Sequence, residues 1–505
     1  MPELDDDAIR EAIISKELSL LGDELPDLNR YRSYYEGEQS LVYSTAKFRE
    51  MFGTQFDGFR DNFTQVVANA VTDKMLLKGI RVGRENEQDD STRKLASLIW
   101  EQFLTNDMDE QQADLFGGMS IEGRSALIVW PDGAGGVTLD WQPAQLVRVR
   151  YDDDVRGKVA WATKRWITAD DATYVTFYTP DSVYKYTEVE PKEPGQQSRR
   201  LDTLTDRAPG TSTFRVYQRR EVVGEPWPLP NPFGRVPVIE FPNAGWTSEL
   251  KGVIPQQDAL NYILMTQMVA AEFSAVKQRV VVTGQSPPTG GFKTGPGIVW
   301  ELRPTFNPDG SVTIPTFGTF DASDPSTYIK IVEMYLQHMA FTTQTPVSYF
   351  FNTDRGGRGD AASGESLKVD AKPLVDKVLK RERISGNRMY QAVRLISDTL
   401  SDTPDDLPIG EVIWQDPRAE YRMALLDEAT KYRDLGYPMS YIHRHLGLSA
   451  EEIEMVEEER EAEKEQAQKD AQAQAEMQAR QAMMPPPSPS PKSSSPTGPG
   501  KLARA

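Results

Sequence analysis

The stretch Gly252–Lys277, GVIPQQDALNYILMTQMVAAEFSAVK, decides how the rest of the chain is interpreted. Pro255 suits the first turn of a helix, where its missing N–H costs nothing, and no helix breaker follows from Gln256 to Lys277. The sequence therefore predicts one helix about 33 Å long. Apolar residues fall on every side of it, which predicts that the helix is buried almost all round.

Polar residues within this stretch argue against a membrane-spanning helix. Asn261, Thr266, Gln267 and Ser274 are spread along it, and Glu272 would be expensive in lipid. Two environments remain: the core of a large domain, or a position between copies of the same chain. For the second, the small pairs Ala270-Ala271 and Ser274-Ala275 would permit close approach. We expect the subunit interface to include Leu260, Ile263, Leu264, Ala271 and Ala275.

Composition bounds the class of protein. The 505 residues can bury several cores, which predicts two or three domains. The absence of cysteine excludes disulfides, thiolate metal sites and a catalytic thiol, and it fits a chain made in a reducing cytoplasm. The N-terminal MPELDDDAIR lacks the apolar core of a secretory signal, so we expect no export by that route. With a formal net charge of −19, the surface is not expected to coat DNA non-specifically.

Helical patterns fill the first part of the chain. Tyr31, Tyr34 and Tyr35 stand close together there, and we expect them to dock on the core rather than to stack on nucleic-acid bases, because stacking modules place aromatic residues on an exposed sheet. The predicted helices are Ala8–Leu21, Leu28–Tyr35, Phe59–Leu77, Thr92–Asp107 and Glu110–Met119.

From Arg124 the apolar pattern becomes alternating, which predicts an antiparallel, meandering β region. The segment Glu190–Ser212 is expected to be a long exposed loop, and six prolines between Gly224 and Pro242 predict an extended connector. The strand-like runs are SALIVW, GVTLDW, QLVRVRY, KVAWATKRW, TYVTFYT, SVYKYTEVE and FRVYQRREVV.

Two further long helices follow the first one, with short strands between. The second helix is predicted over Ser326–Thr343, with Lys330, Glu333 and Gln337 on one face. The third is predicted over Glu365–Leu400, where Pro373 should kink or restart it. The remaining expected elements are strands at Gln278–Thr283, Ile298–Leu302 and Val312–Pro315, a glycine-rich loop at Thr345–Gly364, and helices at Ala419–Leu435 and Met439–His445. Past Glu463 the composition predicts disorder.

A catalytic site is hard to assemble from this sequence. His338, His443 and His445 are interpreted as surface residues, since the last two point to different sides of a helix. GGFKTG at Gly290–Gly295 lacks the order of a phosphate-binding loop, and Asp152–Asp154 sits beside a turn. We therefore predict no catalytic residue, no metal ligand and no cofactor.

Several motifs together resemble the portal proteins of tailed bacteriophages, of the SPP1-like group found in actinobacterial phages. The motifs are RYRSYYEGEQSL at Arg30–Leu41, NFTQVVANAVTDKMLLKGIRVG at Asn62–Gly83, the Gly252–Gly284 stretch, SGESLKVDAKPLVDKV at Ser363–Val378 and LDEATKYRDLGYPMSYIHRHLGLSAEEIE at Leu426–Glu454. The order of the predicted helices and strands agrees with that family over most of the chain.

This resemblance implies an α+β portal fold with a helical stem and crown, an antiparallel β-rich wing, a small β clip and a disordered C-terminal tail. The implied parts are the N-terminal helical part of the wing at 1–120, the β wing at 121–250, stem helices at 251–277 and 324–344, the clip at 278–323, a channel loop at 345–362, a kinked helix at 363–400, a C-terminal helical part at 401–460 and the tail at 461–505.

The resemblance also implies a non-enzymatic function. Copies of the chain, usually twelve, would form a homo-oligomeric ring at one vertex of the capsid, assembled in the host cytoplasm and retained in the virion. Double-stranded DNA would pass through the ring. The implied partners are the terminase large subunit, the head-to-tail connector or adaptor, and the major capsid and scaffolding proteins, with no membrane. An acidic channel wall suits a ring that DNA passes through, because a basic wall would bind the phosphates of the duplex and hold it.

Residue roles follow from the same resemblance. Arg355, Arg358, Asn352 and Asp354 would lie in the channel loop. Lys330, Glu333 and Gln337 would form the channel face of the stem, and Phe292, Lys293 and Trp300 the adaptor-binding clip. Three alternatives stay open: an enzyme acting on nucleic acid, a capsid-associated protease, or a structural oligomer without DNA.

Overall fold

The computed structural model describes residues 6–40, 60–83, 90–189, 216–275, 279–282, 303–319, 325–350, 364–400, 410–418 and 422–446, together with the single positions 456, 460, 464 and 469. The chain folds as two compact units, residues 1–424 and 425–505. The fold is α+β, with every described strand pair antiparallel.

The first unit opens with one helix where the sequence pattern predicted two. Helix α1 (Asp6–Glu36) runs through Pro26 and ends before Gly37, whose φ of +75° favours glycine. The split was wrong because one apolar row keeps helical spacing along its length and packs on a sheet: Ile14, Leu18, Leu21 and Leu28 are all buried. The predicted docking of the tyrosines is confirmed, since Tyr34 is buried and Tyr31 and Tyr35 pack beside it.

The next elements correct one helix boundary. Helix α3 (Phe63–Thr72) is shorter than the predicted Phe59–Leu77, and Leu77 instead begins strand β1 (Leu77–Arg81). Strand β1 pairs with β15 (Glu411–Trp414), more than three hundred residues later. Because the partner strand is so distant in the chain, the local sequence around Leu77 does not indicate a strand. The prediction therefore extended the helix to Leu77. Helices α4 (Asp90–Thr105) and α5 (Met108–Glu122) follow as predicted.

The seven strand-like runs are confirmed, but they form two sheets rather than one meander. Strands β4 (Val147–Tyr151), β5 (Val159–Ile167), β6 (Thr173–Tyr178), β7 (Ser182–Val189) and β8 (Val216–Arg219) make one sheet, with β9 (Leu229–Pro230) paired to β7. The other has the order β10-β2-β3, from β10 (Val238–Pro242), β2 (Arg124–Pro131) and β3 (Val137–Pro143).

Strand β10 corrects the expected proline-rich connector. All its residues are buried, and it pairs with β2 from Val238 opposite Ile128 to Pro242 opposite Arg124. A proline at the end of an edge strand removes no ladder bond from the sheet centre, so Pro242 is compatible with this position. Chain reversal before β2 needs Gly123, because a Cβ there would lie 2.9 Å from the Ser248 nitrogen and its φ is +87°.

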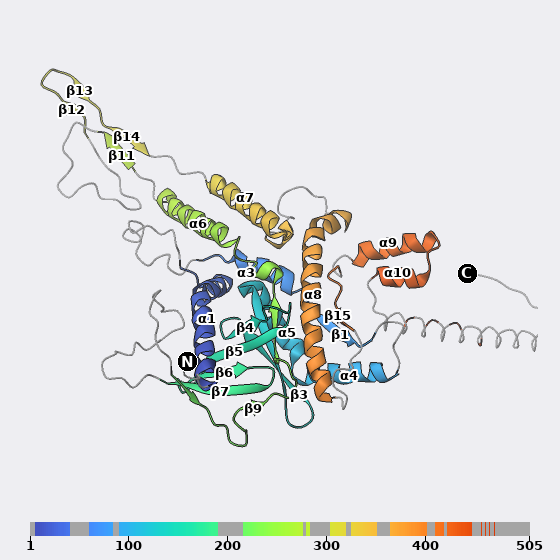
Figure 1. The fold of residues 1–505 in the computed structure, drawn as a ribbon. Helices are drawn as coiled ribbons and strands as arrows, with labels where there is room; N and C mark the ends of the chain where they lie inside the picture. Colours follow the sequence, from blue (N-terminus) through green and yellow to red (C-terminus); the bar gives the residue numbers. More distant parts are fainter. Residues whose placement is uncertain are drawn as a thin grey trace, which may run out of the picture. The chain divides into compact units, whose positions relative to one another are not determined.

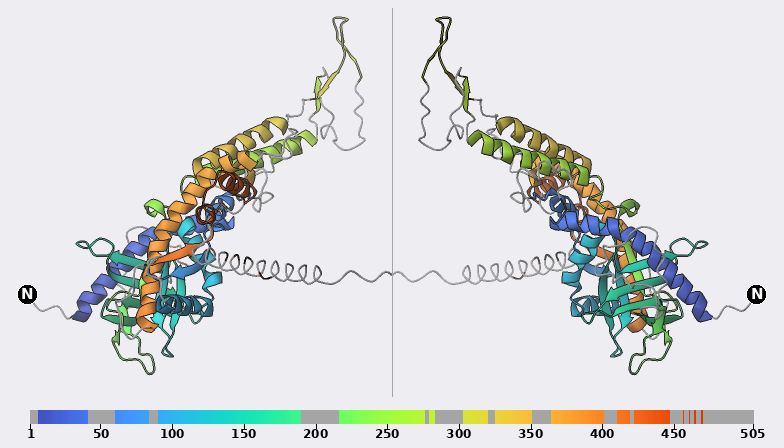
Figure 2. Two further views of the ribbon diagram at one scale, coloured as in Figure 1. Left: turned by 90° about the vertical axis from the view of Figure 1, so that its right-hand side faces the viewer. Right: turned by 90° about the vertical axis from the view of Figure 1, so that its left-hand side faces the viewer.

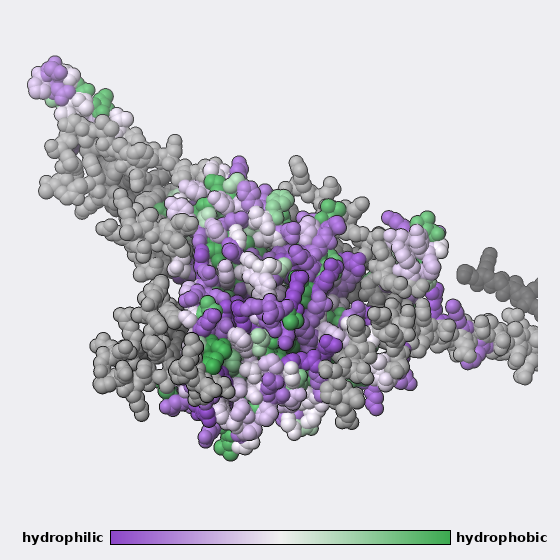
Figure 3. All heavy atoms as spheres, in the orientation of Figure 1, coloured by the Kyte–Doolittle hydropathy of each residue, from purple (hydrophilic) through white to green (hydrophobic). Residues whose placement is uncertain are grey.

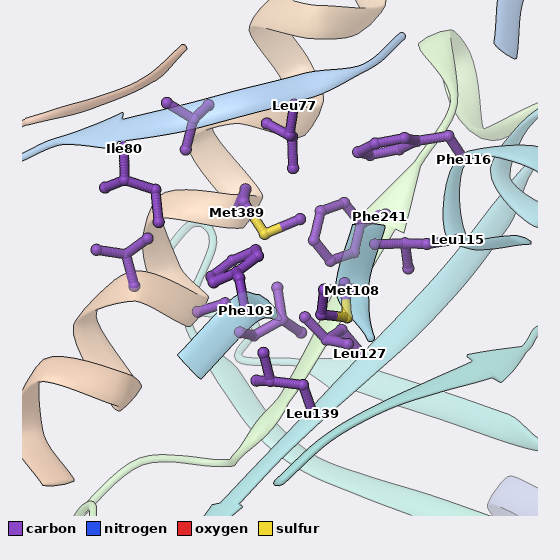
Figure 4. Packing of buried hydrophobic residues seen from close by; sticks show 14 of the residues in the cluster. Leu77, Ile80, Phe103, Met108, Leu115, Phe116, Leu127, Leu139, Phe241 and Met389 are labelled. Carbon is purple, nitrogen blue, oxygen red and sulfur yellow. The ribbon is translucent and has the colours of Figure 1, made fainter. Parts of the chain in front are cut away.

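The largest hydrophobic core joins α5, β2, β3, β10 and α8. Phe116 and Phe241 are fully buried in it, with their ring centroids 6.3 Å apart in an edge arrangement. Figure 4 shows Phe103, Leu115, Leu127 and Met389 converging on the same interior. Residues from Ala70 to Val412 contribute to this core, so the first unit is held together by contacts between distant parts of the chain.

The second half of the unit is a long helical hairpin that carries short strands. Helices α6 (Ile254–Ala275) and α7 (Pro325–Thr343) lie side by side (Figures 1 and 2). The strands between them are β11 (Arg279–Val282), β12 (Thr305–Phe306), β13 (Val312–Thr313) and β14 (Thr316–Thr319), in the pairs β11-β14 and β12-β13. The short turn η2 (Val347–Tyr349) follows α7, and α8 (Gly364–Leu400) runs as one helix through Pro373. The predicted strand Ile298–Leu302 lies outside the described residues.

Helices α9 (Arg422–Asp434) and α10 (Met439–His445) confirm the predicted C-terminal pair. His443 corrects the surface interpretation: its side chain is buried on the same helix as buried Ile442. Of the tail predicted to be disordered, Lys464 and Lys469 are described and are helical, and the rest lies outside the described residues. No helix in the described part of the chain is long and apolar enough to cross a membrane.

Candidate functional site: the α6–α7 hairpin

Polar side chains fix the beginning of α6 to the rest of its own chain. Gln257, fully buried, accepts a hydrogen bond from the Phe63 backbone N–H at 2.8 Å and donates to the Asp61 carbonyl at 2.8 Å. Asn261 accepts from the Asp61 N–H at 3.0 Å. Gln257 and Asn261, the second of which argued against a membrane helix, therefore hold the backbone before α3.

A buried tyrosine–carboxylate pair adds a second fixed point. Tyr34 of α1 donates its hydroxyl proton to Asp258 of α6 over 2.6 Å. Burial, followed by the hydrogen bond to Asp258, raises the pKa of Tyr34 above its usual range. Burial also raises the pKa of Asp258, against the opposing effect of the Tyr34 hydrogen bond. The pair therefore stays hydrogen-bonded, and α1 and α6 are joined at neutral pH.

The apolar side of α6 is buried near its start but not near its end. Leu260 is 0% exposed and packs with Leu336, Met339, Tyr34 and Val67. Leu260 was expected at a subunit interface, but its surface is already used inside its own chain. Of the other expected interface residues, Ile263 and Leu264 are half-buried and Ala271 is exposed, while the side chain of Ala275 lies outside the description. The helix is therefore not buried all round within one chain.

Helix α7 presents two adjoining uncovered faces. Lys330, Glu333 and Gln337, expected on the channel face, are all exposed and follow one another at helical spacing. Met334 and Phe341 lie, on average, roughly 60° around the helix from those three residues. They form an apolar face on which Phe341 is 77% exposed. This apolar face was missed, although the seven-residue spacing of Met334 and Phe341 could have shown it.

The end of α7 is built as a strained cap. The Thr345 N–H bonds the Ala340 carbonyl at 3.0 Å, and Gln344 has a φ of +58°, the left-handed conformation usually taken by glycine in this motif. Thr343 donates to Thr345 between the two hydroxyls at 3.0 Å. The turn therefore fixes where the chain leaves α7.

A buried ion cluster ties this end to α8. Glu249, which precedes α6, pairs with Lys377 at 2.7 Å and with Arg381 at 2.5 Å, and Lys377 also donates to the Thr343 carbonyl at 2.9 Å. Burial alone would raise the pKa of Glu249, but the two cations hold it below the usual range. Burial lowers the pKa of Lys377, which Glu249 opposes. Both ends of the hairpin thus meet on α8.

The outer strands expose apolar side chains. In the β12–β13 hairpin, Phe306 is 79% exposed and Ile314, just beyond, is 72% exposed, with Val312 also exposed. Figure 3 shows apolar residues beside the polar turn at this tip. The residues expected to bind an adaptor, Phe292, Lys293 and Trp300, lie outside the described residues. So do Arg355, Arg358, Asn352 and Asp354 of the expected channel loop.

Within the described ranges, no group of three or more potential ligands could hold a metal ion. Asp152, interpreted as part of a solvated turn, accepts the backbone N–H groups of Asp154 and Val155, and these bonds lower its pKa. Three buried carboxyls were missed by the sequence interpretation. Burial raises the pKa of Glu122 and Glu240 to about 7, and that of Glu382 to about 8, where Asp416 adds to the effect.

These three carboxyls have different surroundings. Glu122 pairs with Arg32 of α1, Glu240 faces Arg124 at 3.5 Å, and Glu382 is destabilised in its charged form by Asp416. Because a perturbed pKa arises in structural networks as well as in active sites, it identifies no reaction here. Their separate partners give no shared acid/base pair.

One protein family matches most of the chain. The model of the family "Phage portal protein, SPP1 Gp6-like" matches residues 21–466. No curated protein matches the chain. Two solved structures are similar over 81% of this chain and 95% of theirs: "Neck of empty GTA particle computed with C6 symmetry", at 12% identity and a TM-score of 0.40, and "Virion of native gene transfer agent (GTA) particle", at 11% identity and a TM-score of 0.41.

Proposed function

Because the chain belongs to the SPP1 Gp6-like family of phage portal proteins, we propose that its copies close into a ring, of twelve subunits, through which double-stranded DNA enters and leaves a capsid. The observation that carries this proposal is the α6–α7 hairpin, which is fixed at its base and leaves apolar side chains uncovered along its length. Helices of this kind need neighbours, and identical subunits that contact head to tail form a ring when the rotation closes.

The subunit contact uses the apolar residues that remain available on the hairpin. Met334 and Phe341 of α7 meet α6 of the next copy, where Ile263 and Leu264 are half-buried and Ala271 is exposed. Ala275 keeps its place in this contact as a prediction from the sequence alone. Leu260 has no part in it, because it is fully buried at the base.

The polar face of α7 borders the apolar one, which suits a helix in a ring wall. When Met334 and Phe341 face a neighbour, Lys330, Glu333 and Gln337 turn toward the bore. Their mixed charge, on a chain of net charge −19, would not hold a duplex tightly. Arg355 and Arg358, with Asn352 and Asp354, would make brief phosphate contacts from the channel loop.

The outer strands supply the docking surface. Phe306, Val312 and Ile314 are exposed there, and with Phe292, Lys293 and Trp300 they would bind the head-to-tail connector and the terminase large subunit. The wing would contact the major capsid and scaffolding proteins. The ring would assemble in the host cytoplasm and remain at the portal vertex of the virion.

Assembly is tested by mass photometry and negative-stain imaging of purified protein. Wild type should form rings. Phe341→Ser should weaken them by removing an exposed apolar contact, and Ala271→Arg should block close approach and leave monomers or aggregates. Ile167→Ser, an equally apolar exposed site on β5, is the matched control and should assemble normally. A wild-type chain that stays monomeric at micromolar concentration contradicts a constitutive ring.

DNA contact is tested separately in a packaging assay in vivo. The double variant Arg355→Ala/Arg358→Ala should assemble into rings but package shorter or poorly retained DNA, because two phosphate contacts per subunit are lost. Arg433→Ala, an exposed arginine on α9, is the control. Full-length, stably retained genomes in the double variant would remove the loop from the mechanism while leaving the ring proposal in place.

A further inference from the structure

An exposed tyrosine surface forms where α9 turns into α10. The ring centroids of Tyr437 and Tyr441 lie 5.1 Å apart in a stacked arrangement, and Tyr432 meets both rings edge-on at 5.2 and 5.9 Å. Tyr437 is 44% and Tyr441 46% exposed, and Leu435 beside them is 74% exposed. We call Tyr432, Leu435, Tyr437 and Tyr441 the tyrosine patch.

The backbone turn between α9 and α10 holds the tyrosine patch in a fixed shape. The Tyr437 N–H bonds the Tyr432 carbonyl at 3.0 Å, and the Gly436 N–H bonds the Arg433 carbonyl at 3.0 Å. Gly436 has a φ of +84°, as the glycine that closes a helix in this motif requires. Pro438 follows and cannot continue α9. The tyrosine rings are therefore already ordered before any ligand binds, which lowers the entropic cost of binding.

The same unit carries a segment whose chemistry fits this surface. Residues 485–492 read PPPSPSPK, beyond the described helices. A proline-rich chain favours the polyproline II helix, with three residues per turn, so Pro486, Pro489 and Lys492 fall on one ridge. Ridges of this kind pack on exposed aromatic rings at low entropic cost. Lys492, at the end of the ridge, would add a cation beside Asp434, the last residue of α9, which lies 3.5 Å from Arg433.

The segment between α10 and the proline run is long enough for the prolines to reach the tyrosine patch. Residues 446–484 separate α10 from the proline run, and a linker of this length spans far more than the tyrosine patch itself. We propose that Pro485–Pro491 docks as a polyproline II segment on the tyrosine patch of its own chain. The proline run, which the ring does not use, then covers the exposed apolar side chains of the α9–α10 pair.

The test is tyrosine nitration with tetranitromethane, read by mass spectrometry on two full-length proteins. One is wild type, and the other has Pro485, Pro486, Pro487, Pro489 and Pro491 changed to Ala. At a millimolar effective concentration, a segment binding with a Kd of about 0.3 mM would slow nitration of Tyr437 and Tyr441 roughly fourfold in wild type. Tyr262, exposed on α6, is the internal control and should react equally in both proteins.

A second experiment tests the proposal even if the proline substitutions change the structure in other parts of the protein. The peptide PPPSPSPKSSSP, added to the Pro→Ala variant, should restore slow nitration, whereas AAASASAKSSSA should not. Tyr441→Leu in that variant should lose peptide binding about tenfold by fluorescence anisotropy, and Leu104→Ala, an exposed apolar change on α4, should not. Equal nitration rates in the two proteins, or equal binding of both peptides, overturns the proposal; strong protection in both proteins would assign the surface to a second copy of the chain.

Discussion

The base of the α6–α7 hairpin and its outer part use the same kinds of side chain in opposite ways. At the base, Leu260 and Met339 are fully buried inside one chain. Farther out, Ile329 and Met334 of α7 are 49% and 44% exposed, and Phe306 beyond them is exposed more fully. At the base one chain completes a core and leaves Phe341 exposed on its outer side, whereas the outer part exposes most of its apolar side chains.

The difference has a physical cause in what surrounds each part. Near the base, α1, α3 and the end of α5 supply Tyr34, Val67 and Ile121 to the same cluster. Farther out, α6 and α7 have mainly each other, and two helices cannot cover all sides of one another. Substitutions should therefore act on folding at the base and on assembly farther out.

The largest effect is expected from breaking the ion cluster at the base. Glu249→Ala leaves Lys377 and Arg381 buried without their counter-charge, which should cost about 3–5 kcal/mol in the free energy of unfolding, measured by chemical denaturation. Lys372→Ala, from an exposed ion pair on the same helix α8, is the control and should change stability by less than about 1 kcal/mol. Similar losses for the two variants would show that the cluster does not anchor the hairpin.

The next test compares two aliphatic residues on the paired helices. Leu260→Ala opens a cavity in a complete core and should cost about 2–5 kcal/mol. Ile329→Ala, at a half-exposed site on α7, should change the stability of the chain within about 0.5 kcal/mol. If both variants unfold at the same denaturant concentration, the contrast between base and outer part is wrong.

A buried carboxyl that has no counter-charge among the described residues sharpens the comparison with Glu249. Burial first, and Asp416 second, raise the pKa of Glu382 to about 8, so the folded chain holds a proton that the unfolded chain releases near pH 4.5. The stability from this proton is fully present below about pH 4.5 and is lost as pH rises through about 8. Glu382→Gln should reduce the fall in stability between pH 5 and 9 by on the order of 2 kcal/mol, measured by denaturation at each pH.

The control for this pH series is Glu110→Gln, an exposed change on α5, which should leave the slope as in wild type. An unchanged slope in Glu382→Gln would mean that Glu382 is ionised in the folded chain at neutral pH.

The smallest effect is expected at the cap of α7. Gln344 holds a φ of +58°, and Gly adopts this conformation without the steric cost of a Cβ. Gln344→Gly should therefore raise stability by about 0.5–1 kcal/mol, seen as a higher Tm. Gln337→Gly, in the middle of the same helix, should lower it by about 1 kcal/mol. A lower Tm for both variants would show that the cap carries no strain.

Part of the fold could be predicted because its signal is local. The seven strand-like runs alternate on their own, and α6 and α7 follow from apolar spacing and from a proline at each start. Two of the errors in the first unit arose where the deciding partner is distant: β1 pairs with β15, and α1 continues through Pro26 because its apolar row lies on a sheet. Strand β10 was hidden by prolines that an edge position tolerates.

The candidate site shows the same limit in single residues. Tyr31, Tyr34 and Tyr35 were expected on the core because aromatic residues in a helix bury large areas, and Tyr34 lies there. Nothing in the order of residues says that Glu249 meets Lys377, or that the acidic Asp416 lies near Glu382, since these depend on which segments pack together. His443 is buried for the same reason.

Most helices and strands, the absence of cysteine chemistry and the portal resemblance could be predicted from the sequence, because they depend on neighbouring residues or on motifs along the chain. Which apolar residues are buried inside one chain and which stay exposed became clear from the three-dimensional packing. Leu260 and Phe341 are both apolar residues on predicted helices, yet one is fully buried and the other 77% exposed. Burial is a property of the surrounding elements, and those are brought together only when the whole chain folds.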